Sequence, residues 1–130
     1  MNTGLAAWHR YMSSGDPDLL SDLLADDVVF HSPVVRTPQE GREKTTLYLR
    51  AAALVFSADS GFRYLREIVD GPEACLEFAA TIDAIEINGI DLIRFDLEGR
   101  IADFKVMIRP IRAVNLVWEK MAAQLQALEG

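Results

Sequence analysis

The sequence predicts an α+β protein in which helices gather on one face of a curved antiparallel sheet. Two observations predict this class. Apolar residues recur at helical spacing in most of residues 5–57 and again after residue 110, whereas between residues 62 and 110 they alternate with polar residues, as in half-buried strands. The chain has 130 residues and no internal repeat or linker, so we expect one domain over 1–130.

Two helices are expected before the first strand. Apolar residues share one face of a first helix, which a glycine ends: Leu5, Trp8, Met12 and then Gly15. Asp16 is a suitable N-cap, and Pro17 a suitable first residue, for a short leucine-rich second helix. We expect the Ala-Asp-Asp segment at 25–27 to mark the end of that helix.

A strand and a third helix are expected next. The β-branched and aromatic run "VVFHS" at 28–32 predicts a strand, which Pro33 stops because proline is tolerated only at a sheet edge. Thr37-Pro38-Gln39-Glu40 matches a capping box, and the apolar stripe that follows predicts a helix over 39–57. Gly41 leaves the exact start of this helix open.

The second half of the chain predicts a four-stranded meander followed by a helix. Turns are expected at 70–71, 88–89 and 97–99, each of which contains a glycine. After residue 110 a helical stripe must cover apolar surface on the sheet or on a second subunit, and it comprises Val114, Val117, Trp118, Met121, Leu125 and Leu128.

Charge limits the partners. The chain has 13 basic and 20 acidic residues, for a net charge of -7, which disfavours nucleic acid and acidic membranes because both are bound mainly through Lys and Arg. A small neutral or apolar ligand fits better. A homodimer is also expected, through Trp118 of the terminal helix and an outer sheet face that includes Lys105, Met107 and Arg109.

The sequence indicates no cofactor and no metal site. Nucleotide-binding, metalloprotease and hydrolase motifs are missing, and His9 and His31 are its two histidines. The single cysteine, Cys75, is interpreted as a small buried apolar residue. The chain shows neither a signal peptide nor a membrane-spanning segment, so a cytoplasmic location is expected.

Strand alternation predicts which side chains face the core. In the first strand, Val28, Phe30 and Ser32 should face inward and His31 outward. In the strand around 91–95, Asp91 shares the inner face with Ile93 and Phe95; in the last strand, Phe104, Val106 and Ile108 point inward.

Asp91 has two interpretations. A carboxylate on an apolar face must be paired or have a raised pKa, which makes it a functional candidate. Alternatively, it follows a turn at Asn88-Gly89 and caps backbone amides there. His31 has the side chain best suited to a general base at neutral pH, although alternation turns it outward. Trp8, Tyr11 and Tyr48 are either cavity-lining aromatic residues or core.

Three stretches, in order, carry a resemblance to a known family: "SSGDPDLLSDLLADDVVFHSP", "GREKTTLYL" and "GIDLIRFDLEGRIADFKVMIRP". Together they resemble the nuclear-transport-factor-2-like superfamily, in particular its SnoaL-like branch of polyketide-cyclase and ketosteroid-isomerase relatives. The resemblance covers nearly the whole chain. It implies a single SnoaL-like domain, cone-shaped, whose curved sheet wraps around three N-terminal helices and a deep apolar pocket, in homodimers that contact through the outer sheet face.

The resemblance also suggests site residues. Ketosteroid isomerase uses an aspartate base and an oxyanion hole made of a tyrosine and a protonated aspartate, and the protonated aspartate falls on Asp91 of "GIDLIRF". The position of the base is taken by Ser32 and that of the tyrosine by Trp8. A serine cannot abstract a carbon-bound proton without an activating base, and an indole can only donate. The chain therefore departs from the isomerase pattern at two of these positions.

Two hypotheses from different classes follow. In the first, the pocket performs acid–base chemistry of the isomerase, cyclase or dehydratase type on a small hydrophobic carbonyl or polyketide-like compound. In the second, it is a non-catalytic binding module for an apolar ligand. The catalytic candidates are Asp91, Ser32 and His31, and the ligand-binding candidates are Trp8, Met12, Phe30, Tyr48, Phe95, Phe104 and Val106.

Overall fold

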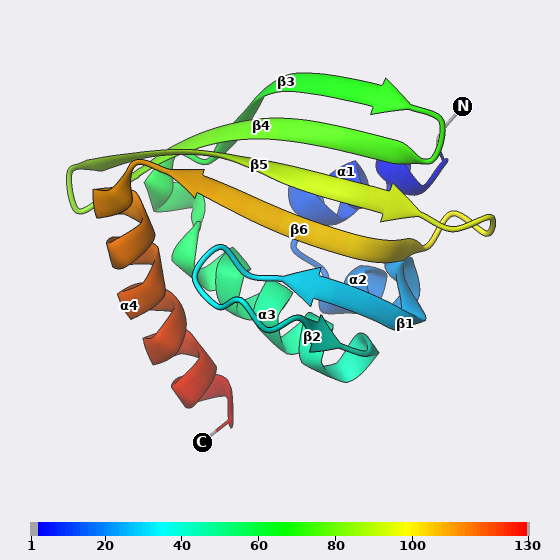
Figure 1. Ribbon diagram of the computed structural model, residues 1–130, viewed down its shortest axis with the longest axis horizontal. Coiled ribbons are helices and arrows are strands. Elements are labelled where there is room, and N and C mark those ends of the chain that lie inside the picture. The colour runs from blue at the N-terminus through cyan, green and yellow to red at the C-terminus, as the bar shows by residue number, and fades with distance from the viewer. Residues whose placement is uncertain (1–2, 130) are drawn as a thin grey trace.

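The computed structural model describes residues 3–129 as a curved, unclosed six-stranded sheet with helices against one face (Figure 1). The elements are α1 (Thr3–Ser14), α2 (Pro17–Leu23), β1 (Leu24–His31), β2 (Gln39–Glu40), α3 (Arg42–Val55), a 3-10 turn η1 (Ala58–Ser60), β3 (Arg63–Asp70), β4 (Glu73–Ile82), β5 (Ile85–Phe95), β6 (Ile101–Arg109) and α4 (Ile111–Glu129). The α+β class with a curved sheet, three N-terminal helices and a C-terminal helix is confirmed.

The strand order is β2-β1-β6-β5-β4-β3. The strands β3 to β6 form the expected antiparallel meander, and β2 pairs antiparallel with β1. The pair between β1 and β6 is parallel, so the sheet is not antiparallel throughout. This pairing joins the first strand of the chain to its last and places Phe30 beside Phe104 on the inner face.

The first two helices form as expected, but β1 begins earlier. Gly15 follows α1 with a φ of 70°, and Asp16 caps α2 by accepting a 3.0 Å hydrogen bond from the backbone amide of Asp18. The prediction that residues 25–27 end the second helix is wrong, because these residues belong to β1. Leu24 is fully buried and pairs with Ile101, so core packing draws this segment into the sheet.

The third helix begins later than its apparent capping box. Gln39 and Glu40 pair with β1 instead of starting a helix, and Gly41, with a φ of 98°, occupies the N-cap position of α3 without a side-chain cap. Arg42 then fixes the start of α3 by donating through Nε to the carbonyl of Leu24, at 3.2 Å. The capping-box prediction is therefore wrong, whereas the helix itself is confirmed.

The turn between β4 and β5 lies elsewhere than expected. Asp83 and Ala84, both with positive φ, make the turn, and Asn88-Gly89 lies inside β5. A Cβ at Gly89 would lie 2.5 Å from the carbonyl oxygen of Met107 and 2.6 Å from the ring of Phe78. The glycine is therefore needed for a close approach within the sheet and not for a turn.

The terminal helix covers the far end of the sheet. Ala113, Leu116 and Val117 of α4 pack with Phe78 and Ile87 in a second hydrophobic cluster, separate from the main core below β1, β5 and β6. Figure 1 shows α4 descending from the end of β6 alongside α3. Trp118, expected in the covering stripe, is 59% exposed. Within residues 3–129, the helices are all too short or too polar to cross a membrane.

Candidate functional site

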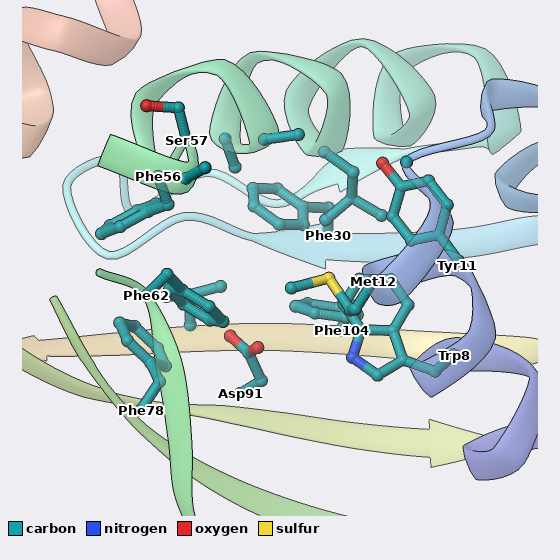
Figure 2. Close-up of a pocket in the computed structure, with 16 residues that line it drawn as sticks. Trp8, Tyr11, Met12, Phe30, Phe56, Ser57, Phe62, Phe78, Asp91 and Phe104 are labelled. Carbon is teal, nitrogen blue, oxygen red and sulfur yellow. The ribbon is translucent and has the colours of Figure 1, made fainter. Parts of the chain in front are cut away.

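A cavity of about 260 Å³ lies between the inner face of the sheet and helices α1 and α3 (Figure 2). Aromatic and aliphatic side chains dominate its wall. The lining residues are Trp8, Tyr11, Met12, Gly15, Phe30, Leu49, Ala52, Ala53, Phe56, Ser57, Ala58, Phe62, Phe78, Asp91, Phe104 and Val106. Those that remain exposed, such as Met12, Ala53 and Ser57, come from the last turns of α1 and α3 and from the segment after α3, so the mouth lies there.

Asp91 is the single carboxyl among the lining residues. Alternation along β5 turns Gly89, Asp91, Ile93 and Phe95 inward, and Asp91 is 6% exposed. Figure 2 shows its carboxyl group rising from the sheet into the space between Phe62 and Phe104. The predicted inward orientation is confirmed, and the interpretation of Asp91 as a turn residue that caps backbone amides is wrong, because it lies mid-strand and accepts no backbone hydrogen bond within residues 3–129.

A tyrosine of β3 holds Asp91 in place. The alternation of the last three strands did not point to this tyrosine. The Tyr64 hydroxyl donates to Oδ2 of Asp91 at 2.7 Å, and the Trp8 indole N–H donates to the Tyr64 oxygen at 3.0 Å. His9 takes no part in these hydrogen bonds; it meets the edge of the Tyr64 ring and pairs with Glu67. Oδ1 of Asp91 accepts no hydrogen bond from residues 3–129 and is free for a ligand.

Burial dominates the electrostatics of this pair. Desolvation raises the pKa of Asp91 to about 7, and the hydrogen bond from Tyr64 opposes that rise. The pKa of Tyr64 is also raised, by burial and by the adjacent Asp91 charge, so the phenol keeps its proton. At neutral pH, Asp91 is therefore present in both protonation states beside a neutral donor.

The structure places two of the three catalytic candidates outside the cavity. Ser32 follows β1, and its hydroxyl accepts a 3.1 Å hydrogen bond from the amide of Val34. His31 faces the outer side of the sheet, as alternation predicts, and its Nε2 lies 2.9 Å from Oδ1 of Asp103. Neither residue lines the cavity.

Five of the seven ligand-binding candidates line the cavity: Trp8, Met12, Phe30, Phe104 and Val106. Tyr48 does not; its ring packs 5.4 Å from that of Phe30. Phe95 is buried under Gly4, away from the cavity.

Several aromatic residues of the site escape the sequence prediction. Phe56, Phe62 and Phe78 line the cavity, and Tyr64 supports it. Alternation in "FRYLREIV" and "CLEFAATI" is a signal that could have placed Phe62, Tyr64 and Phe78 on the inner face. Phe56, at the end of α3, carries no comparable signal. Within residues 3–129 no cluster of His, Cys, Asp and Glu could hold a metal ion.

Comparisons with known proteins agree with this architecture. A family model described as a SnoaL-like domain matches residues 5–104. A steroid delta-isomerase from Pseudomonas aeruginosa is 37% identical, with a TM-score of 0.90 over 97% of this chain and 91% of that chain. An uncharacterised protein with a cystatin-like fold from Silicibacter pomeroyi is 32% identical, with a TM-score of 0.86 over 95% of this chain and 86% of that chain.

More distant structures share the fold alone. An NTF2-like protein of unknown function from Mesorhizobium loti is 19% identical, with a TM-score of 0.70 over 83% of this chain and 89% of that chain. No curated protein sequence matches significantly. The family model and the two closely similar structures cover most of the chain, and the TM-scores show that these two structures share its fold. The chain therefore belongs to the SnoaL-like domain family.

Proposed function

We propose that the protein transfers protons on a small hydrophobic carbonyl compound, with Asp91 acting as both acid and base. The observation that supports this proposal is a buried carboxyl group whose Oδ1 is unpartnered within residues 3–129 and faces an apolar cavity. A carboxylate takes a proton from a ligand carbon or oxygen, and the resulting carboxylic acid returns it to another position of the same ligand. No cofactor is needed for such a transfer.

The pKa of Asp91 suits this role. General acid–base catalysis is most efficient when the pKa of the catalytic group lies near the working pH. With its pKa raised by burial to about 7, Asp91 is a stronger base than an ordinary carboxylate and still gives up its proton readily.

Tyr64 and Trp8 act as positioning residues. Tyr64 fixes Oδ2 of Asp91, which leaves Oδ1 as the reacting atom, and Trp8 directs the Tyr64 hydroxyl through its own N–H. Tyr64 is not among the lining residues, so it acts on the ligand through Asp91. Trp8 also lines the cavity.

The lining also supports a neutral ligand. No Lys, Arg or His is among the lining residues, and an ionised Asp91 would repel an anion. The similarity to a steroid delta-isomerase, at 37% identity, supports a ketone as the first compound to test.

A direct test uses 2-tetralone, a bicyclic ketone whose protons beside the carbonyl exchange with solvent. The protein in D2O should accelerate deuterium incorporation at C1, followed by NMR, above the buffer rate. Asp91→Asn should lower the protein-dependent rate by roughly 10²- to 10⁴-fold, the usual contribution of one general base. Asp103→Asn, a matched change on the outer face, should keep the rate. An unchanged rate in Asp91→Asn would contradict the proposal.

One observation favours the alternative, a non-catalytic binding module. The indole N–H of Trp8 is already committed to Tyr64, so it does not offer a donor to an oxyanion beside Asp91. Binding of 2-tetralone by calorimetry without any protein-dependent exchange would favour this alternative over the catalytic proposal.

A further inference from the structure

A second polar group of the cavity comes from α1. Tyr11 lies one helical turn after Trp8, is 5% exposed and is among the lining residues. Its ring packs against that of Trp8, with 5.4 Å between centroids. The Tyr11 hydroxyl makes no hydrogen bond with any of residues 3–129, although the backbone carbonyl of the same residue accepts from Gly15 and Ser14.

The unpartnered hydroxyl of Tyr11 is in contact with open space. Within residues 3–129, Thr45 Oγ1 is the one side-chain polar atom that is both sealed from solvent and without a hydrogen bond. The Tyr11 hydroxyl also lacks a partner there, so it is not sealed. Because the side chain is otherwise covered and lines the cavity, we place this hydroxyl at the cavity wall, on the side of α3 and near Arg50.

Tyr11 and Asp91 stand at different ends of the cavity. Figure 2 shows the Tyr11 hydroxyl turned towards α3, whereas the Asp91 carboxyl rises from β5 on the other side, with the rings of Phe30 and Phe104 between them. The wall between the two polar groups is therefore apolar. A ligand that satisfies both groups carries its polar atoms at its two ends.

Tyr11 is a neutral phenol. Burial raises its pKa, and the positive charge of Arg50 opposes this only in part. A neutral phenol donates to a carbonyl oxygen or accepts from a hydroxyl. Arg50 itself is exposed and does not line the cavity, so it offers no direct contact to an anionic ligand there.

We propose that Tyr11 is a specificity-determining residue and that the cavity takes a neutral compound of one or two rings with an oxygen function at each end. The oxygen near Asp91 is the one acted on, which rests on the proposed function, and the distal oxygen is held by Tyr11. The cavity volume of about 260 Å³ is small beside the roughly 300–1,000 Å³ of most ligand pockets, which sets the limit of one or two rings.

The experiment compares dissociation constants, measured by calorimetry, for 2-tetralone and its 6- and 7-hydroxy derivatives. In the wild-type protein, one hydroxy derivative should bind about fivefold tighter than 2-tetralone, the gain from one added hydrogen bond. In Tyr11→Phe, the ratio of the two constants should fall to about one. Tyr48→Phe is the matched control, because Tyr48 packs on Phe30 without lining the cavity, and it should keep the wild-type ratio.

Failure of the Tyr11 proposal can be distinguished from failure of the proposed role of Asp91. A ratio that survives in Tyr11→Phe overturns the role of Tyr11 alone, while deuterium exchange still tests Asp91. If none of the three tetralones binds the wild-type protein, the role of Tyr11 and the small-ketone cavity are overturned together. Tighter binding of 6-carboxy-2-tetralone than of both hydroxy derivatives would overturn the neutral ligand class. A crystal structure of the tighter complex should place the distal oxygen within hydrogen-bond distance of the Tyr11 hydroxyl.

Discussion

The Tyr64 hydroxyl reaches the Asp91 carboxyl across an intervening strand, because Tyr64 lies on β3, Asp91 on β5 and β4 between them. Tyr64 is in register with Phe78, and Phe78 with Gly89. Since Gly89 has no side chain, the ring of Phe78 lies close over the backbone of β5 there. The hydrogen bond therefore spans a strand whose inward side chain, Phe78, packs against a glycine.

Removing the Tyr64 hydroxyl should raise the pKa of Asp91. The hydrogen bond from Tyr64 favours the charged carboxylate, so in Tyr64→Phe desolvation acts unopposed and the pKa rises above about 7. The rising limb of the pH profile of deuterium exchange should move to higher pH, and carbon NMR of the labelled carboxyl should give the same shift. Tyr48→Phe should leave the profile in place. A fall in the pKa would contradict the assignment.

Asp91 should make the protein less stable as pH rises. Its pKa is raised from 3.8 to about 7 on folding, so between these values the folded protein holds a proton that the unfolded chain releases. The free energy of unfolding therefore falls from about pH 4 to about pH 7, by at most about 4 kcal/mol from this group, and is unaffected by it above that range.

Urea unfolding of the wild-type protein and Asp91→Asn at several pH values checks this dependence. The stability of Asp91→Asn relative to the wild-type protein should grow from pH 4 to pH 8, because the asparagine cannot ionise. Asp103→Asn serves as the comparison for a carboxyl on the outer face. If the stability difference between Asp91→Asn and wild type did not vary with pH, burial would not raise the pKa of Asp91 on folding.

Gly89→Ala should destabilise the fold and disturb the cavity. The added methyl group would overlap the carbonyl oxygen of Met107, which is backbone and cannot move away alone, as well as the ring of Phe78. Overpacking of this kind costs about 1–3 kcal/mol. Thermal unfolding measures the loss, with the exposed β4 substitution Thr81→Ala as the control. If Gly89→Ala were as stable as the wild-type protein, β5 and β6 would have to move apart at little cost in free energy.

The outer face of the sheet stays a predicted homodimer interface. Exposed apolar side chains on it include Ile68, Leu92 and Met107, among the charged residues of the same face. Leu92→Glu should shift sedimentation of a micromolar sample from dimer to monomer. Leu97→Glu, in the loop after β5, should have no such effect. A wild-type monomer at this concentration would remove the dimer from consideration.

Alternation predicted the orientation of Asp91 from sequence because parity along a strand does not depend on where the strand ends. For that reason the prediction of which β5 residues face inward was correct, although the predicted turn at Asn88-Gly89 was wrong. The turn itself could not be located, since Asp83 and Ala84 adopt positive φ without a glycine, while the glycine that resembles a turn residue serves a close contact between strands.

Tyr64 and Tyr11 show why the rest of the site was harder to predict. Alternation could have placed Tyr64 on the inner face, but the partner of its hydroxyl, Asp91, lies two strands away. Tyr11 sits on a helix where aromatic residues are usually core, and only the missing hydrogen-bond partner within residues 3–129 distinguishes it. Such facts concern contacts between distant segments, which spacing along one segment does not contain.

The two tryptophans occupy opposite environments, so the intrinsic fluorescence of the protein can report on the cavity. Trp8 is 3% exposed, lines the cavity and donates to Tyr64, whereas Trp118 is 59% exposed on α4. An aqueous quencher should reach the emission of Trp118 long before that of Trp8. In Trp118→Phe, the remaining fluorescence should come from one indole at the wall of the cavity, so that occupation of the cavity and the charge of Asp91 both become visible without any label.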